Sequence, residues 1–340
     1  MCISFVPGSF LKTGQNYRSY SAALISAVLL SSCGSPVSQM QATSIEGSVV
    51  QSAEQAPPGI PTPEMFAGNT GQSYGWKQLF EAMDAADVIV IGEWHADARG
   101  HVIQAEIIAT ALQRWDGAAL SLEEFDRSQQ AEVDAFQRGE LTATELKAVR
   151  NFVMPAVRDN WMDWNLPKLE AARQAGAPVL ASNAPLQYSR MVRNTGCDNL
   201  PDLSEEQLAL FDCPAAPEDP LYKARFAVGI TSAISRNKPK GLKSLGTEQI
   251  DRMFRAQRVW DATMAASIVQ AHDEGARKVL HVVGNVHSDF DGGLIQELNY
   301  RDPDSRVLVI SVVPTRSCSL LESDLGRADI VIYAGACQAL

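Results

Sequence analysis

The sequence predicts an α/β fold with a mostly parallel central sheet, flanked by helices, and a smaller helical subdomain. From Tyr74 onward, short runs rich in Val, Ile and Leu alternate with longer stretches in which apolar residues recur every three or four positions, as in βαβ units. The short runs are apolar almost throughout, which suits strands covered by helices on both faces. With 340 residues, of which 46% are hydrophobic, the chain is long enough to bury such a core.

Each expected strand is a short apolar run bounded by polar residues or glycine. The six runs are Asp87–Gly92, Ala118–Phe125, Pro178–Ala184, Lys278–Gly284, Arg306–Val313 and Ala328–Ala334. Helical periodicity is clearest in Val102–Arg114, Gln129–Arg138, Leu166–Ala175 and Glu248–Asp273. Residues 141–164 and 198–243 are interpreted as helical insertions, which would form the smaller subdomain over the sheet edge.

Residues 1–32 are predicted to be a lipoprotein signal peptide. Lys12 and Arg18 precede an uncharged run from Ala22 to Leu30, which is too short to span a bilayer. The run leads into Leu-Ser-Ser-Cys-Gly, which resembles the bacterial lipobox, so Cys33 is expected to carry the acyl chains, palmitate included. An ordinary secretory signal is the alternative. In either case the protein is exported, and the lipobox predicts an anchor in the outer membrane or facing the periplasm.

Residues 33–73 are expected to form a lipid-anchored flexible tether, and residues 74–340 the α/β domain. The stretch from 34 to about 63 is rich in Ser, Gln, Pro and Gly and too poor in large apolar side chains to offset chain entropy. No second apolar run approaches the length of a membrane span, so the lipid would be the only membrane attachment.

The net charge argues against nucleic acid as a partner. Cleavage after residue 32 would remove two cations and no acid, which takes the formal charge from −11 to −13. Nucleic-acid binding rewards clustered Lys and Arg instead.

The cysteine count suits an oxidising compartment. Of six cysteines, Cys2 would leave with the signal peptide and Cys33 would carry lipid. The remaining four are Cys197, Cys213, Cys318 and Cys337, which allow three pairings. Pairing 197 with 213 and 318 with 337 is preferred because each pair brackets a short loop-rich segment. Four unpaired, buried thiols are the alternative.

Polar residues follow four of the predicted strands, where an open α/β sheet binds its ligands. The strand ends are Gly92-Glu93-Trp94-His95, Glu123-Glu124, Asn183 and Gly284-Asn285-Val286-His287. Residues two apart on an extended chain point the same way, so Glu93 can lie beside His95. A lone His or Glu at such a place is usually a satisfied or solvated polar residue, but coincidence across four strands favours a functional cluster.

Two chemistries suit this cluster. Glu93, His95, Glu123, Glu124 and His287 could ligate a divalent metal such as Zn or Mn. Alternatively, a glutamate could orient a histidine as general base. In a metal-assisted hydrolase, Glu93, His95, Glu124 and His287 would hold the divalent ion or activate water.

Other residues could contact a large flat cofactor such as haem. His101, six residues after His95, begins the next helix and could face the crevice, whereas His272 and His281 are interpreted as structural. Trp161, Trp164 and Phe152 could line an apolar pocket or simply pack the insertion. Tyr188 and Tyr222 are candidate axial ligands. The cofactor-contacting set is completed by the strand-end amides of Asn183 and Asn285.

These motifs together resemble the ChaN family of haem-binding lipoproteins, in the superfamily that includes Tiki, TraB and the erythromycin esterases. The resemblance runs from about Val88 to Val313. It is carried by the Gly92–His95 and Gly284–His287 motifs with His101, by Leu122–Asp126 with Gln129-Gln130, by Asn183–Pro185, by Ala256–Asp261 with Met264-Ala265, and by Gly292-Gly293.

The resemblance implies a surface- or periplasm-facing lipoprotein that binds haem for iron acquisition. It also implies a homodimer and an outer-membrane haem receptor as partners. Hydrolytic members of the superfamily imply the alternative, a metal-dependent peptidase or esterase, and a scaffold whose polar edge only binds a partner is the third. The chain departs from the family in having Gly100, not His, before His101, and no tyrosine matches the family's haem ligand.

Overall fold

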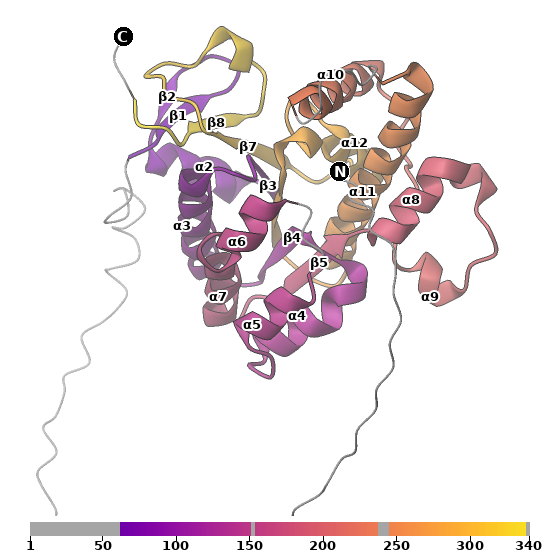
Figure 1. The fold of residues 1–340 in the computed structure, drawn as a ribbon. Coiled ribbons are helices and arrows are strands. Elements are labelled where there is room, and N and C mark those ends of the chain that lie inside the picture. The colour runs from indigo at the N-terminus through magenta and orange to yellow at the C-terminus, as the bar shows by residue number, and fades with distance from the viewer. Residues whose placement is uncertain (1–61, 151–153, 237–244, 338–340) are drawn as a thin grey trace, which may run out of the picture. The chain divides into compact units, whose positions relative to one another are not determined.

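An eight-stranded sheet runs through the described part of the protein (Figure 1). The computed structural model describes residues 62–150, 154–236 and 245–337, which lie within one unit spanning Ser48–Leu340. The strands are β1 (Glu64–Ala67), β2 (Ser73–Tyr74), β3 (Val88–Glu93), β4 (Ala118–Asp126), β5 (Val179–Asn183), β6 (Lys278–Gly284), β7 (Val307–Val313) and β8 (Ile330–Tyr333). Their order in the sheet is β2-β1-β8-β7-β3-β6-β4-β5.

The six strands from β8 to β5 are parallel, as the apolar runs predict. All six expected strands are present, and their ends differ from the expected ones by two residues or fewer. The fold-class prediction is therefore confirmed.

The antiparallel edge was not expected. β1 pairs with both β2 and β8 and lies inside the range 33–73 that the sequence suggested as a tether. Met65 and Phe66 are buried against the core, so this short apolar segment gains both backbone pairing and burial. The ordered domain thus begins before Tyr74. Cys33, the signal peptide and the first part of the tether lie outside the described residues.

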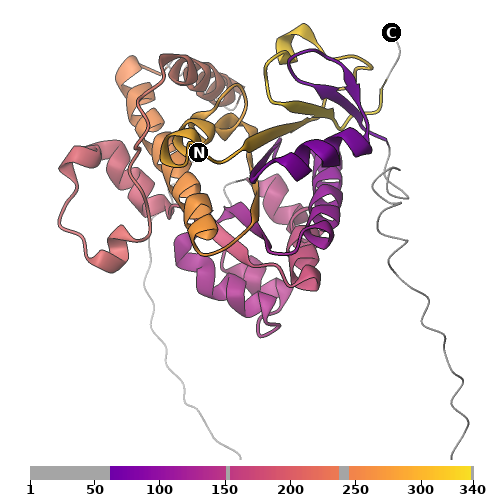
Figure 2. The same cartoon turned by 180° about the vertical axis from the view of Figure 1, so that it is seen from behind.

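Helices cover the two faces of the sheet unequally (Figures 1 and 2). One face carries α2 (Trp76–Ala85), α3 (Ala98–Arg114), α4 (Gln130–Gln137), α5 (Ala143–Ala148), α6 (Pro155–Trp164) and α7 (Leu166–Ala175). The other carries α11 (Thr247–Asp273) and α12 (Gly293–Arg301). Successive side chains of a strand point alternately into the two cores. In β3, Ile89 and Ile91 face the first helix layer, and Val88 and Val90 face the second.

The two insertions are helical, as expected, but they pack differently. Leu146 and Trp161 of the first insertion join the main core. The second contains η3 (Cys197–Asn199), α9 (Glu205–Leu208) and α10 (Pro220–Arg236). Together with α8 (Leu186–Thr195), it builds two smaller clusters against α11, around Phe211 and around Tyr222. Within the described ranges, no helix has the length and apolar character needed to cross a membrane.

Candidate ligand site at the carboxyl end of the sheet

The carboxyl ends of the parallel strands bring the predicted polar residues to one edge. Glu93 is the last residue of β3, Glu123 and Glu124 lie near the end of β4, and Asn183 ends β5. A 3-10 turn, η4 (Asn285–His287), follows β6 directly and contacts the end of β3. The side chains at this edge separate into two networks, with His95 between them.

The first network is centred on the buried carboxylate of Glu93. Its Oε1 accepts a hydrogen bond from His95 Nδ1 at 2.9 Å, and its Oε2 lies 3.3 Å from the Nζ of Lys168 in α7. Burial would raise the pKa of Glu93, but the Lys168 ammonium and the His95 hydrogen bond hold it well below its usual range. Glu93 is therefore an anion at neutral pH.

His101 belongs to this network, and both of its ring nitrogens are hydrogen-bonded within the protein. Its Nε2 donates to the backbone carbonyl of His95 at 3.0 Å, and its Nδ1 accepts from Lys168 at 3.3 Å. The Trp164 ring stacks on the imidazole, with centroids 4.8 Å apart. Burial and the Lys168 ammonium lower the pKa of His101, so the ring stays neutral. With both nitrogens engaged inside the protein, His101 does not face the crevice.

The second network is centred on His287 and is also buried. His287 Nδ1 lies 2.6 Å from Asp261 Oδ1, and Nε2 lies 3.4 Å from Glu123 Oε1. The Tyr222 hydroxyl donates to the other oxygen of Asp261 at 2.8 Å, and the Gln257 amide donates to that hydroxyl at 3.1 Å. Asp261 and Gln257 lie one turn apart on α11, so they share one face of the helix.

The charges of the second network favour an imidazolium. Burial alone would lower the pKa of His287, but the Asp261 and Glu123 carboxylates raise it to about 10. Burial likewise would raise the pKa of Glu123, yet His287 lowers it to about 2. Burial raises the pKa of Asp261, and the hydrogen bonds from His287 and Tyr222 oppose that rise. In the imidazolium form both ring nitrogens carry protons, and they face the Asp261 and Glu123 carboxylates.

His95 lies between the two networks and reaches the surface. Its side chain is 39% exposed. A Cβ on Gly284 would lie 2.6 Å from His95 Nε2 and 3.4 Å from Glu123 Oε2, so only glycine leaves room for the imidazole at this position. Burial opposes protonation of His95, but the hydrogen bond to Glu93 and the nearby Glu123 carboxylate raise its pKa. Trp94 follows Glu93 at the end of β3, Val286 lies in η4 after β6, and these two residues are 47% and 44% exposed.

Glu124 does not join the cluster that the sequence suggested. Its carboxylate pairs with Arg150 at 2.8 Å and accepts from Trp161 Nε1 at 2.9 Å. Glu123 and Glu124 are consecutive strand residues, and consecutive side chains point to opposite faces. The expected set of Glu93, His95, Glu124 and His287 is thus divided among three separate environments.

The other expected cofactor contacts are engaged within the protein. Tyr188 is buried and stacks on Phe211, with centroids 4.9 Å apart, and the Tyr222 hydroxyl belongs to the His287 network. The amide of Asn183 donates to the backbone carbonyl of Glu123 at 3.0 Å. The amide of Asn285 donates to Asp289 at 3.2 Å. Phe152 lies outside the described residues.

Among the described residues, no group of three or more His, Cys, Asp or Glu side chains is arranged to hold a metal ion. His281 is buried, hydrogen-bonds to Ser121 Oγ at 2.8 Å, and has a pKa that burial lowers to about 3. His272 lies 3.8 Å from Asp302 at the far end of α11.

Sequence reasoning missed Lys168 and Asp261 as members of the site. Asp261 and Gln257 stood in the motif from Ala256 to Asp261, but nothing in the sequence tied them to His287. Lys168 carried a weak signal, because it lies one turn before Ala172 on the buried side of α7. A charged residue there needs a partner, and the sequence does not say which one.

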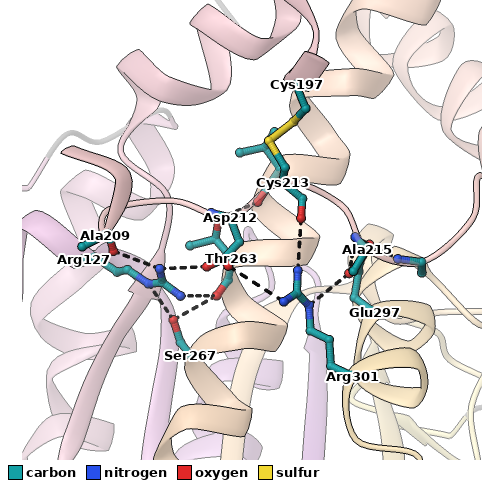
Figure 3. A network of polar contacts seen from close by, with 12 residues as sticks. Arg127, Cys197, Ala209, Asp212, Cys213, Ala215, Thr263, Ser267, Glu297 and Arg301 are labelled. Carbon is teal, nitrogen blue, oxygen red and sulfur yellow. Dashed lines mark hydrogen bonds and ion pairs between the residues drawn. A yellow bond between two sulfur atoms is a disulfide. The ribbon is translucent and has the colours of Figure 1, made fainter. Parts of the chain in front are cut away.

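Both predicted disulfides are present. They join Cys197 to Cys213 and Cys318 to Cys337. The first closes a loop that is fastened to the helices on the second face of the sheet (Figure 3). Arg127 forms an ion pair with Asp212 at 2.9 Å, and Arg301 of α12 donates to the Cys213 carbonyl at 3.1 Å. Just after the loop, Glu297 of α12 accepts hydrogen bonds from the backbone N–H groups of Ala215 and Ala216, at 3.0 and 3.1 Å.

The family model described as haem-binding uptake, Tiki superfamily, ChaN matches residues 79–298. The chain belongs to this family. Its recognition from sequence motifs is thereby confirmed, and so is the α/β fold that the family implies. No curated protein sequence matches the chain.

Solved structures of this family and of other proteins resemble the chain. ChaN of Campylobacter jejuni, described with cofacial heme binding, is 17% identical with a TM-score of 0.59, and the match covers 80% of this chain and 96% of that one. The type III effector HopBA1 is 16% identical with a TM-score of 0.44, covering 83% and 100%. An erythromycin esterase mutant in its open conformation is 13% identical with a TM-score of 0.38, covering 78% and 80%.

Proposed function

We propose that this chain binds haem at a rim formed by Trp94, His95 and Val286, with His95 Nε2 as the iron ligand. Membership of the haem-binding family carries the proposal. The exposure of His95 supports it, because its side chain is 39% exposed. The other candidate ligands are buried, namely His101, His287, Tyr188 and Tyr222. Haem iron commonly takes an imidazole nitrogen as its axial ligand.

The residues of the rim fit such a group. Glu93 accepts from Nδ1 of His95, an arrangement that leaves Nε2 as the ligating nitrogen in many protein metal sites. The raised pKa of His95 means that protons compete with iron for Nε2. Trp94 and Val286 offer apolar surface beside it, and an apolar porphyrin face would bury that surface.

Titration of the purified protein with hemin tests the proposal. We expect a saturable Soret band, and an affinity that falls at least about 10-fold in His95→Ala, because the iron ligand is lost. His272→Ala is the matched control, since this histidine lies at the opposite end of the sheet. Absence of a saturable spectral change in the wild-type protein would refute haem binding.

A second pair of variants tests the location of the rim. Trp94→Ser removes exposed apolar surface beside His95 and should weaken hemin binding by about 5-fold. Tyr300→Ser removes a comparably exposed aromatic side chain, 58% exposed, from the last turn of α12 at the opposite edge. Equal effects of the two substitutions would place the binding surface elsewhere.

The cellular role that we propose is iron acquisition by an exported lipoprotein, anchored through Cys33 on the outer membrane or facing the periplasm. The signal peptide and lipobox support export, and the family supports haem as cargo. A receptor in the outer membrane and a second copy of this chain are the partners this role would involve.

A metal-dependent hydrolase receives less support from the geometry. Glu124 is paired with Arg150, and the ring of His287 is held between two carboxylates. The proposed function therefore assigns no catalytic role to Glu93, His95, Glu124 or His287. Metal analysis of the purified protein tests this choice, since one equivalent of Zn or Mn would restore the hydrolase hypothesis.

A further inference from the structure

Lys168 is a buried lysine on the side of α7 that faces β3 and α3. Its side chain is 1% exposed. Its Nζ lies 3.3 Å from each of three partners, which are Glu93 Oε2, His101 Nδ1 and Gln104 Oε1. Only Glu93 among these carries a charge, because His101 is neutral. A buried ammonium needs an anion, so the two side chains are bound to one another electrostatically.

The same carboxylate makes the hydrogen bond that orients His95. The two oxygens of Glu93 have different partners, because Oε2 faces Lys168 and Oε1 faces His95 Nδ1. A rotation of the carboxylate away from Lys168 would therefore also move the acceptor of His95. Lys168 itself does not contact the surface, and the exposed imidazole lies on the other side of Glu93.

We propose that Lys168 is a positioning residue, which fixes the Glu93 carboxylate so that His95 keeps its proton on Nδ1 and presents Nε2 to a ligand. The haem part of this inference rests on the proposed function. The placement of the proton on His95 does not, since it is a property of the protein without ligand.

A double-mutant cycle tests the inference, with Lys168→Met, Glu93→Gln and the variant that carries both substitutions. Nitrogen NMR of the imidazole, recorded above the midpoint of its titration, reports which ring nitrogen of His95 carries the proton. We expect Nδ1–H in the wild-type protein and a shift toward Nε2–H in each single variant. Hemin affinity should fall about 10-fold in each. In the double variant neither measurement should change beyond Glu93→Gln alone, because Lys168 acts through Glu93.

The outcomes separate positioning from simple structural support. Lys278→Met, which removes a partly buried lysine from the opposite end of the sheet, should leave both measurements unchanged. If Lys168→Met fails to fold but the double variant folds, the coupling to Glu93 is supported. The inference is overturned if Lys168→Met leaves the His95 proton in place, if its effects persist undiminished in Glu93→Gln, or if Glu93→Gln folds and the double variant does not. A wild-type protein that binds no hemin would refute the proposed function, while the NMR comparison would still judge Lys168.

Discussion

At the scale of single residues, two histidines at the same sheet edge differ in what they can do. His287 is enclosed, and both of its nitrogens face carboxylates. His95 is bound through one nitrogen only, and its side chain is partly exposed. The difference follows from their partners and not from their residue type. His287 is suited to holding the edge together, and His95 to meeting a ligand.

The raised pKa of His287 predicts a pH-dependent contribution to stability. Because its folded-state pKa is about 10 and its unfolded value 6.5, the contribution is complete below pH 6.5 and is lost as pH rises toward 10. The difference in unfolding free energy between the wild-type protein and His287→Gln should therefore shrink between pH 7.5 and 10, by on the order of 2 to 3 kcal/mol. Urea unfolding at several pH values measures it.

His281→Gln is the control for this measurement. The pKa of His281 is lowered to about 3, so its imidazole is neutral in both states above pH 7.5. Its effect on stability should stay constant over the same range. A His287→Gln difference that is equally constant would mean that the ring is not held as a cation.

At the scale of secondary-structure elements, the segment between α8 and α10 is held by cross-links as well as by the small apolar cluster around Phe211. The segment from Cys197 to Cys213 contains one short helix and one 3-10 turn. Its disulfide joins its two ends, and Asp212 pairs with Arg127, whose guanidinium also donates to the Thr263 carbonyl of α11 (Figure 3). The chain then continues into α10, which carries Tyr222 and so reaches the His287 network.

Removal of the first disulfide should destabilise this part of the protein. In a variant with Ser at both Cys197 and Cys213, the free energy of unfolding should fall by about 3 kcal/mol, as expected for a loop with a sequence separation of 16. Limited proteolysis should then cut between the two positions. The variant with Ser at Cys318 and Cys337 serves as control and should not become cleavable there. Unchanged stability and unchanged cleavage would show that the polar contacts alone hold the loop.

At the scale of the whole molecule, the proposed role depends on where the domain is held. Signal cleavage would remove two cations and no acid, which takes the formal charge from −11 to −13. A domain with this net negative charge is not attracted to an anionic membrane surface by its overall charge. A lipid at Cys33 would supply that attachment, with the following residues as the spacer to β1.

Metabolic labelling with radioactive palmitate tests the anchor. The wild-type protein should take up label and require detergent for extraction, whereas Cys33→Ser should do neither. Cys2→Ser is the matched control, because Cys2 precedes the cleavage site and should not matter. Label retained in Cys33→Ser would show that the lipobox is not used.

The sequence by itself predicted the six parallel strands, four of the helices, the preferred disulfide pairing and the family. These features depend on local patterns. Lys278–Gly284 is apolar at most positions and is a strand with those ends, and the spacing of the cysteines matches short loops. The sequence also placed Glu93, His95 and His287 at one edge, because parallel strands end together.

Only the tertiary structure decided which of those side chains are neighbours. Glu123 and Glu124 are adjacent in sequence, yet one contacts His287 and the other Arg150. Lys168 and Asp261 come from helices on opposite faces of the sheet and complete the two networks. Such contacts depend on side-chain direction and on packing between elements far apart in the chain, which no local pattern records. For the same reason, the exposure that distinguishes His95 from His101 and His287 becomes visible only in the folded protein.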